Sequence, residues 1–511
     1  MIRRNVENFV CLDDYPIVET TEGKYRGFQD GDVLCYRGIP YGIAKRFQKP
    51  EAAESFEGVR NAYDYGPVDP GMSYSAQGIA SPDNIITQRR LWYRSENCLN
   101  LNIWSKLGSA GKKPVMVWLH GGGFAGGSSV DLYSYDGWEM SHFYDVVVVT
   151  VNHRLNMSGF LDLSSYGEQY ASTGILGMLD LVAALKWINK NIAQFGGNPE
   201  NVTIYGQSGG GAKVTTLMQM PSADGLYHKA IVQSGVFPAN AFSNLSAEVA
   251  EFAIKRLGLN HDNIREIETM DYEKLGKAIW ESCVDAGTDA FRVWLPIPDG
   301  KEYVGNPLDV GFREETKDIP MIVGSCLSEF DEIPQGTKSE YSEEEKIKML
   351  TDKFGGQAKR VLNAYESVYP EMDISYATCV DTMVRSATVS YLNLRTQSTC
   401  APVYNYIFCF ESVFMGGQLT GHNGDLHFMF HNACHIPAMC RKGITERLQN
   451  EMAVAWASFA RTGNPNAEGL IFWPEYDCLK KSCMMFGNQT MVKENHDEVL
   501  LKEIQNAYKP N

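Results

Sequence analysis

The sequence lacks several features that would suit it to membranes, nucleic acids or a disulfide-bonded scaffold. Its net charge of −16 comes from 46 Lys and Arg against 62 Asp and Glu, and no basic run offsets it locally. A chain of this charge is a poor partner for nucleic acid or for an anionic membrane surface. Its longest apolar stretches, 115–119 and 146–151, have the length of a strand and are too short to span a bilayer. We therefore expect a soluble protein.

The first 23 residues and the cysteines also lack the marks of secretion. Glu7, Asn8, Asp13 and Asp14 interrupt every short hydrophobic run near the start, so the apolar segment of a secretory signal is missing. The twelve cysteines are widely spread and contain no C-x-x-C pair. Such spacing in a chain this long does not resemble a disulfide framework. These observations predict reduced cysteines and a cytoplasmic location.

The order of strand and helix patterns predicts an α/β protein. Short strand-like segments separated by turn residues fill the first hundred residues. From Pro114 onward the strands become continuous apolar runs, as in strands that are buried on both faces. A helix is expected over 176–192, because apolar residues recur there at helical spacing until Gly-Gly-Asn-Pro at 196–199. We expect one domain over 1–511, with helix-rich insertions at about 243–320 and 338–400 that cover the site.

A candidate nucleophile, Ser208, lies in the sequence Gly-Gln-Ser-Gly-Gly at 206–210, directly after the strand-like run 202–205. In an α/β-hydrolase, a sharp turn of this kind between strand and helix lifts the serine hydroxyl above the sheet, and glycines leave room for the neighbouring backbone. The five-letter pattern alone occurs often by chance, so the prediction depends on its context and on partner residues. It indicates a serine hydrolase.

The partners that a nucleophilic serine needs follow in the order expected for this fold, which is serine, acid, histidine. Glu329 comes shortly after the buried strand 321–323, and we assign it as the acid. His422 ends a glycine-bearing loop after the strand 403–408, and we assign it as the general base. The alternative interpretation of Glu329 is a solvated loop carboxylate.

A glycine-rich loop supplies the third part of the predicted site. His-Gly-Gly-Gly-Phe at 120–124 follows the strand 115–119, as the corresponding motif does in lipases and esterases. Backbone N–H groups of Gly122 and Gly123, with that of Gly209 after the nucleophile, would hold the oxyanion of a tetrahedral intermediate. Neither a metal nor a cofactor is needed for this chemistry.

A metal site is the first alternative for part of these residues. His427, His431 and His435 fall at helical spacing of four residues, close to His422. Neither an H-E-x-x-H motif nor a cluster of carboxylates accompanies them, so packed or surface histidines are the favoured interpretation.

An NAD(P)-dependent oxidoreductase is the second alternative, because Gly121, Gly123 and Gly126 match the dinucleotide fingerprint after a strand. That fingerprint should open a helix, whereas 127–136 has the composition of a loop. The acid that would bind the ribose is also missing after the next strand, although Arg154 could suit a 2′-phosphate. A non-catalytic binding protein on the hydrolase fold is the third alternative.

These motifs together resemble those of the type-B carboxylesterases, a family that includes bacterial para-nitrobenzyl esterases and the cholinesterases. The similarity covers most of the chain. Matching stretches are 36–41, 95–102, 120–124, 152–154, 195–199, 206–210 and 456–465. The resemblance implies the α/β-hydrolase fold, with a large and mostly parallel sheet, and hydrolysis of small-molecule carboxylic esters. It implies that Glu329 is the acid and His422 the histidine, the same two residues that the strand order indicates.

The resemblance also implies further roles. Ser234 would support the acid, and Arg46 would pair with Glu96. Gln207 stands where the family usually has glutamate, which removes a charge that would favour cationic esters. Asn423 and His427 replace the usual residues after the histidine, and Asp69 stands where disulfide-bonded members have the partner of Cys98. We further expect an apolar substrate pocket lined by Phe124, Phe237, Ala241, Phe291 and Trp294.

Overall fold

The computed structural model describes residues 8–71, 87, 89–108, 112–238, 241, 245–330, 341–414 and 417–508. The chain divides into two compact units. The large unit comprises Ile2–Ile231 and Ala239–Thr316, and the small unit comprises Met1, Val232–Pro238 and Lys317–Asn511. The strand β12, Lys229–Gln233, carries the chain from the large unit into the small one. The expectation of one hydrolase domain stays a prediction.

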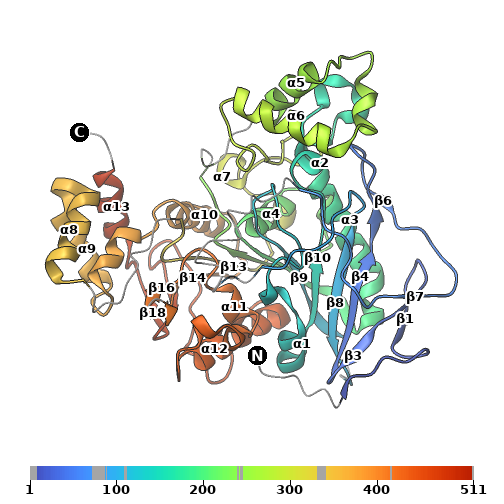
Figure 1. Ribbon diagram of the computed structural model, residues 1–511. Coiled ribbons are helices and arrows are strands. Elements are labelled where there is room, and N and C mark those ends of the chain that lie inside the picture. Colours follow the sequence, from blue (N-terminus) through green and yellow to red (C-terminus); the bar gives the residue numbers. More distant parts are fainter. Residues whose placement is uncertain are drawn as a thin grey trace. The chain divides into compact units, whose positions relative to one another are not determined.

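The main strands of the large unit are parallel on one side and antiparallel on the other (Figure 1). Their order is β11 (Gly197–Gln207), β9 (Lys113–Leu119), β10 (Val147–Val151), β8 (Asn100–Lys106), β4 (Val33–Pro40) and β3 (Phe28–Asp30). Every residue of β9 and β10 is buried, which explains their continuous apolar sequences. Smaller sheets join β1 (Ile17–Glu19), β2 (Lys24–Arg26) and β7 (Val59–Asn61), and β5 (Gly42–Ile43) with β6 (Glu51–Ala52).

Helices complete the large unit. They are α1 (Trp138–Tyr144), α2 (Asn156–Phe160), α3 (Leu176–Asn191), α4 (Gly209–Leu217), α5 (Ser246–Arg256), α6 (Tyr272–Asp285) and α7 (Pro307–Val310). The helix expected over 176–192 is α3. In the expected insertion at about 243–320, α5 and α6 pack side by side (Figure 1).

One helical stretch among the described residues, Glu168–Phe195, is long and apolar enough to cross a membrane. Within its most apolar window, 78% is buried inside the structure, as in the core helix of a globular protein.

The small unit has its own parallel strands. β14 (Val403–Cys409) lies between β13 (Met321–Cys326) and β17 (Cys483–Gly487), and β18 (Met491–Lys493) pairs antiparallel with β17. β15 (Glu411–Ser412) pairs with β16 (Gln418–Leu419). The helices are α8 (Glu343–Phe354), α9 (Ala358–Val368), α10 (Val384–Ser398), α11 (Leu426–Met429), α12 (Thr445–Thr462) and α13 (Glu498–Ala507).

The insertion expected at about 338–400 begins outside the described residues and contains α8, α9 and α10. Its first two helices share a hydrophobic cluster with the last helix of the chain, α13 (Figure 1). Leu350, Val361, Tyr365, Leu500 and Ile504 belong to that cluster and are at most 1% exposed. These helices therefore build part of the core of the small unit, and their predicted role in covering the site stays a prediction.

Candidate active site

Ser208 occupies a strained turn between β11 and α4. Its backbone has φ +58° and ψ −128°, in the left-handed region that residues other than glycine seldom adopt. The strand before it is buried from Val202 to Gln207, and α4 begins at Gly209. This is the strand-to-helix geometry that the sequence motif predicts for a nucleophile.

The glycine loop after β9 lies directly against this turn. A Cβ added to Gly209 would lie only 2.4 Å from the backbone N of Gly123, so any other residue would push the loop away. Gly122 and Gly123 both have positive φ, +94° and +62°. Within the part of the chain that the structure describes, no acceptor takes the N–H of either residue or of Gly209. The backbone N–H groups of Gly122, Gly123 and Gly209 can thus bind a negative oxygen.

Glu329 and His422 form a hydrogen-bonded pair in the small unit. Glu329 follows β13, and its Oε2 accepts a short hydrogen bond from Nδ1 of His422. The other oxygen, Oε1, accepts from the backbone N–H of Cys326 at 2.8 Å. The Ser234 hydroxyl also donates to this carboxyl group. The acid is therefore fixed on both oxygens, and it orients the imidazole.

Burial sets the protonation of this pair. The side chain of Glu329 is fully buried, which raises the pKa of its carboxyl, while the hydrogen bonds from Ser234 and Cys326 oppose that rise. Burial lowers the pKa of His422 to about 4. At neutral pH the imidazole is therefore uncharged, which is the form that can take a proton from a nucleophile.

A second carboxyl group, Asp425, lies close to the pair and was missed by the sequence analysis. It is completely buried, and its Oδ2 accepts from Gln233 Nε2 at 2.8 Å and from the Tyr406 hydroxyl at 2.6 Å. Its negative charge raises the pKa of His422 and of Glu329. Its only signal in the sequence is an aspartate three residues after His422. That signal is weak because the neighbouring residues do not reveal that the side chain is buried beside Glu329 and His422.

The expected pocket residues have different surroundings. Phe124 and Trp294 are buried, whereas Phe291 is 44% exposed and Ala241 is half-buried. The Phe291 ring lies 3.4 Å from the place where a Cβ on Gly123 would be, so it borders the glycine loop.

In the small unit, Phe237 contacts a ring that the sequence analysis missed. Its centroid is 6.5 Å from that of Phe330, which in turn lies 4.2 Å from the His422 ring. Phe330 directly follows Glu329 in the chain, and that position was its only signal.

Two further residue pairs named from the sequence can be placed. Arg46 and Glu96 form a bidentate ion pair with both N–O distances at 2.6 Å, and Arg46 also donates to backbone carbonyls of the large unit. Asp69 is buried and accepts from the N–H groups of Gly71 and Leu155, and burial raises its pKa to about 7. None of the twelve cysteines, all of them described, forms a disulfide, so Cys98 is a free thiol.

The histidines at 427, 431 and 435 do not share one helix. α11 ends at Met429, and His431 has φ +60°, which breaks the helical course. His427 is buried, and His431 Nε2 lies 2.6 Å from Asn450 Oδ1. Among the described residues, no three side chains of His, Cys, Asp or Glu are arranged to hold a metal ion.

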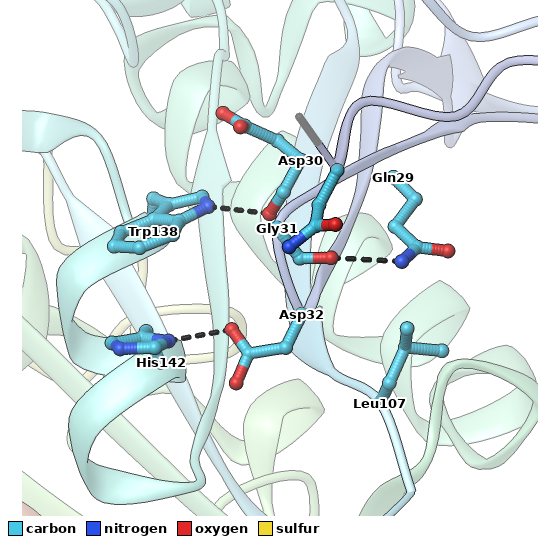
Figure 2. A pocket seen from close by; sticks show the side chains of 8 residues that line it. Gln29, Asp30, Gly31, Asp32, Leu107, Trp138 and His142 are labelled. Atoms are coloured by element: carbon cyan, nitrogen blue, oxygen red, sulfur yellow. Dashed lines mark hydrogen bonds and ion pairs between the residues drawn. The ribbon is translucent and has the colours of Figure 1, made fainter. Parts of the chain in front are cut away.

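A pocket of about 480 Å³ lies elsewhere in the large unit (Figure 2). Its walls include Asp32, Trp138 and His142, and the carboxylate of Asp32 faces the His142 ring at 2.5 Å. Asp32 lies just before β4, whose first residue pairs with Lys106 at the end of β8. That end of β8 faces the start of the parallel strands, whereas Ser208 follows the last residue of β11. The pocket and Ser208 therefore lie at opposite ends of the strands.

Comparison with known proteins gives matches over nearly the whole chain. Residues 14–502 match a family model described as the carboxylesterase family. The chain is 31% identical to a para-nitrobenzyl esterase of Bacillus subtilis, over 94% of this chain and 96% of that protein. It is 30% identical to carboxylesterase 1C of Mus musculus, over 90% of this chain and 88% of that one.

Solved structures agree with these matches. An esterase from anaerobic Clostridium hathewayi that can hydrolyze aliphatic aromatic polyesters has 38% identity and a TM-score of 0.91, over 98% of this chain and 99% of that chain. A thermophilic para-nitrobenzyl esterase has 28% identity and a TM-score of 0.76, over 96% and 99%. The predicted α/β-hydrolase fold is thereby confirmed.

Proposed function

Because the chain belongs to the carboxylesterase family and is a carboxylic ester hydrolase, we propose that Ser208 is its nucleophile, His422 its general base and Glu329 the acid that orients the base. The backbone N–H groups of Gly122, Gly123 and Gly209 form the oxyanion hole. The observation that carries this assignment is the buried hydrogen bond between Glu329 and His422, because a buried carboxylate that orients a neutral histidine is the partner a serine nucleophile requires.

The reaction has two halves. Ser208 Oγ attacks the ester carbonyl carbon while His422 Nε2 takes the hydroxyl proton, and the three N–H groups hold the resulting oxyanion. The ester C–O bond then breaks, and His422 returns the proton to the departing alcohol. In the second half a water molecule gives its proton to His422 and attacks the acyl-enzyme. The carboxylic acid leaves, and Ser208 regains its proton.

The dinucleotide alternative has no support. Its glycine pattern should open a helix, but the described residues from 121 to 132 form turns and loop without a helix. The same glycines have the tight approach to Gly209 that an oxyanion loop needs.

Labelling with a fluorophosphonate is the direct test of the nucleophile. The phosphonate forms a covalent bond with an activated serine, so mass spectrometry of the digested protein should find the label on Ser208 alone. The Ser208→Ala variant should no longer be labelled. A label on another serine in the wild type would overturn the assignment.

Neutral esters are the proposed substrates. Gln207 is buried beside the nucleophile, and its amide oxygen lies 3.2 Å from the position of a Cβ on Gly121. A neutral dipole stands there in place of the fixed negative charge that would attract a cationic alcohol group. The Phe291 ring borders Gly123, which favours esters with an aryl or medium-length apolar group. The polyester activity of the Clostridium hathewayi esterase is consistent with aryl esters.

A matched pair of substrates tests the charge argument. A choline ester and its uncharged carbon isostere should have similar values of kcat/KM, because aromatic faces alone attract a cation by only about 0.5–2 kcal/mol. The measurement is made at moderate salt with pure enzyme. A preference for the choline ester above about tenfold, equivalent to about 1.4 kcal/mol of transition-state binding, would contradict the argument.

A cytoplasmic location is part of the proposal. It is supported by the twelve cysteines, which form no disulfide and include a fully buried Cys98 whose thiol pKa is raised by burial.

A further inference from the structure

Lys213 is a buried cation without a counter-charge, five residues after the nucleophile. It lies on α4 and has none of its surface exposed. Among the described residues no carboxylate forms an ion pair with it, and burial is the only influence on its pKa. Lysine is almost never fully buried unless it is paired, because its ammonium loses its hydration. A buried, unpaired lysine next to a catalytic serine therefore calls for a functional reason.

Its contacts lie at both ends of the glycine loop. Lys213 Nζ donates to the backbone carbonyl of His120 at 2.9 Å, and His120 is the residue directly before the first loop glycine. The same ammonium lies 6.0 Å from the ring centroid of Phe124, directly after Gly123. A single side chain thus contacts the residues that bracket Gly121, Gly122 and Gly123.

The titratable neighbours of Lys213 do not neutralise it. The rings of His120 and His153 stack with centroids 5.1 Å apart, and burial together with the charge of Lys213 lowers the pKa of both well below the usual value. Each is held by Nδ1 at 2.8 Å from a backbone carbonyl. Both histidines are therefore neutral near pH 7.

The other described elements packed on α4 offer no carboxylate that is available to pair with Lys213. On α3, both oxygens of Asp180 are engaged by Arg154, at 2.6 and 2.8 Å. On β11, burial keeps the hydroxyl of Tyr205 neutral by raising its pKa. Burial alone lowers the pKa of Lys213 to about 7.

We infer that Lys213 is a positioning residue of the oxyanion hole, whose ammonium holds the His120 carbonyl and places a positive charge behind Gly122 and Gly123. This inference rests on the proposed assignment of Ser208 and the glycine loop. A positive charge in a dry site stabilises an oxyanion that develops nearby more than it stabilises the neutral ester. Since Lys213 carries its charge only below its lowered pKa, the stabilisation is present at lower pH and lost as the pH rises through about 7.

The pH profile of kcat/KM tests the charge, because it reports ionisations of the free enzyme. In the wild type, kcat/KM for a neutral ester should fall through one ionisation between about pH 6 and about pH 9. Lys213→Met should be about tenfold slower than the wild type at the acid end and flat across this range. Lys213→Arg keeps a charge that does not titrate there, so it should lose the alkaline fall while retaining activity.

Lys229→Met is the matched control. Lys229, the first residue of β12, is also buried, with its pKa lowered to about 8. It donates to the Asn201 side chain on β11, several residues before the nucleophile turn. Its removal should leave the alkaline fall in place. A wild-type profile without that fall, or an unchanged fall in Lys213→Met, overturns the inference. The wild-type measurement is decisive even if a variant does not fold.

An arylboronic acid separates transition-state from ground-state effects. Its tetrahedral adduct with Ser208 places a negative oxygen in the oxyanion hole, so Lys213→Met should weaken its inhibition about tenfold while the KM of the ester changes little. If boronate inhibition and ester binding, measured by KM, weakened by the same factor, Lys213 would have a merely structural role and the inference would be overturned. Ser208→Ala is measured in parallel: if it retains activity, the proposed site itself is wrong, whereas an inactive Ser208→Ala with a wild-type-like Lys213→Met refutes only the role of Lys213.

Discussion

Ser208→Ala is expected to lower kcat by roughly 10⁴-fold or more and to leave the melting temperature close to that of the wild type. The loss follows because His422 and Glu329 then have no hydroxyl to activate. The fold should persist because alanine keeps the Cβ that serine already carries in its strained conformation at φ +58°. Steady-state kinetics with a neutral ester, and a thermal unfolding scan of the same sample, measure the two quantities.

Ser234→Ala is the control for that experiment. Ser234 is also a buried serine with positive φ, +47°, directly after a strand, but its hydroxyl donates to Glu329 and lies outside the proposed chemistry. Its removal should cost only about tenfold in kcat, because the Cys326 N–H still holds the acid. Turnover near the wild-type rate in Ser208→Ala would end the assignment of the nucleophile.

The parts of the site that could be predicted are those in which backbone geometry restricts the sequence. A serine with positive φ between a strand and a helix needs small neighbours. A Cβ added to Gly209 would lie 2.4 Å from Gly123, so no side chain fits there. Both constraints require glycines, and these glycines are visible in the sequence as motifs. The acid and the histidine could be assigned because each follows a buried strand. The α/β class was predictable for the same reason, since β9 and β10 are buried along their whole length.

What could not be predicted depends on burial produced by distant parts of the chain. Asp425 and Lys213 are ordinary polar letters in the sequence, and only packing makes them a second buried carboxyl group and an unpaired buried cation. Likewise, the hydrophobic periodicity of the inserted segments predicts helices but not their partners. The packing of α5 on α6 and of α8 on α9 is seen only in the structure. The spacing of His427, His431 and His435 is typical of one helix face. His431 has positive φ, however, so no helix continues through these three residues.

His422→Ala is expected to lower kcat by roughly 10⁴-fold, whereas His431→Ala should retain most of the activity. The base is indispensable because a serine hydroxyl at neutral pH is a weak nucleophile. His431 Nε2 instead donates a hydrogen bond to Asn450 Oδ1 at 2.6 Å, so its loss should reduce stability by about 1 kcal/mol and leave the chemistry intact. Both variants are compared by kcat and by thermal unfolding.

Exhaustive chelation completes this comparison, because the same four histidines could otherwise be read as metal ligands. The wild type should keep full activity after dialysis against a strong chelator, since the proposed oxyanion hole is made of backbone N–H groups and the base is activated by Glu329, not by a Lewis acid. Activity that disappears on chelation and returns with a divalent metal, together with a loss in His431→Ala as large as that in His422→Ala, would mean that the carbonyl is polarised by a metal. The histidine at position 422 would then be a ligand, and the serine mechanism would have to be abandoned even though the fold is that of a carboxylesterase.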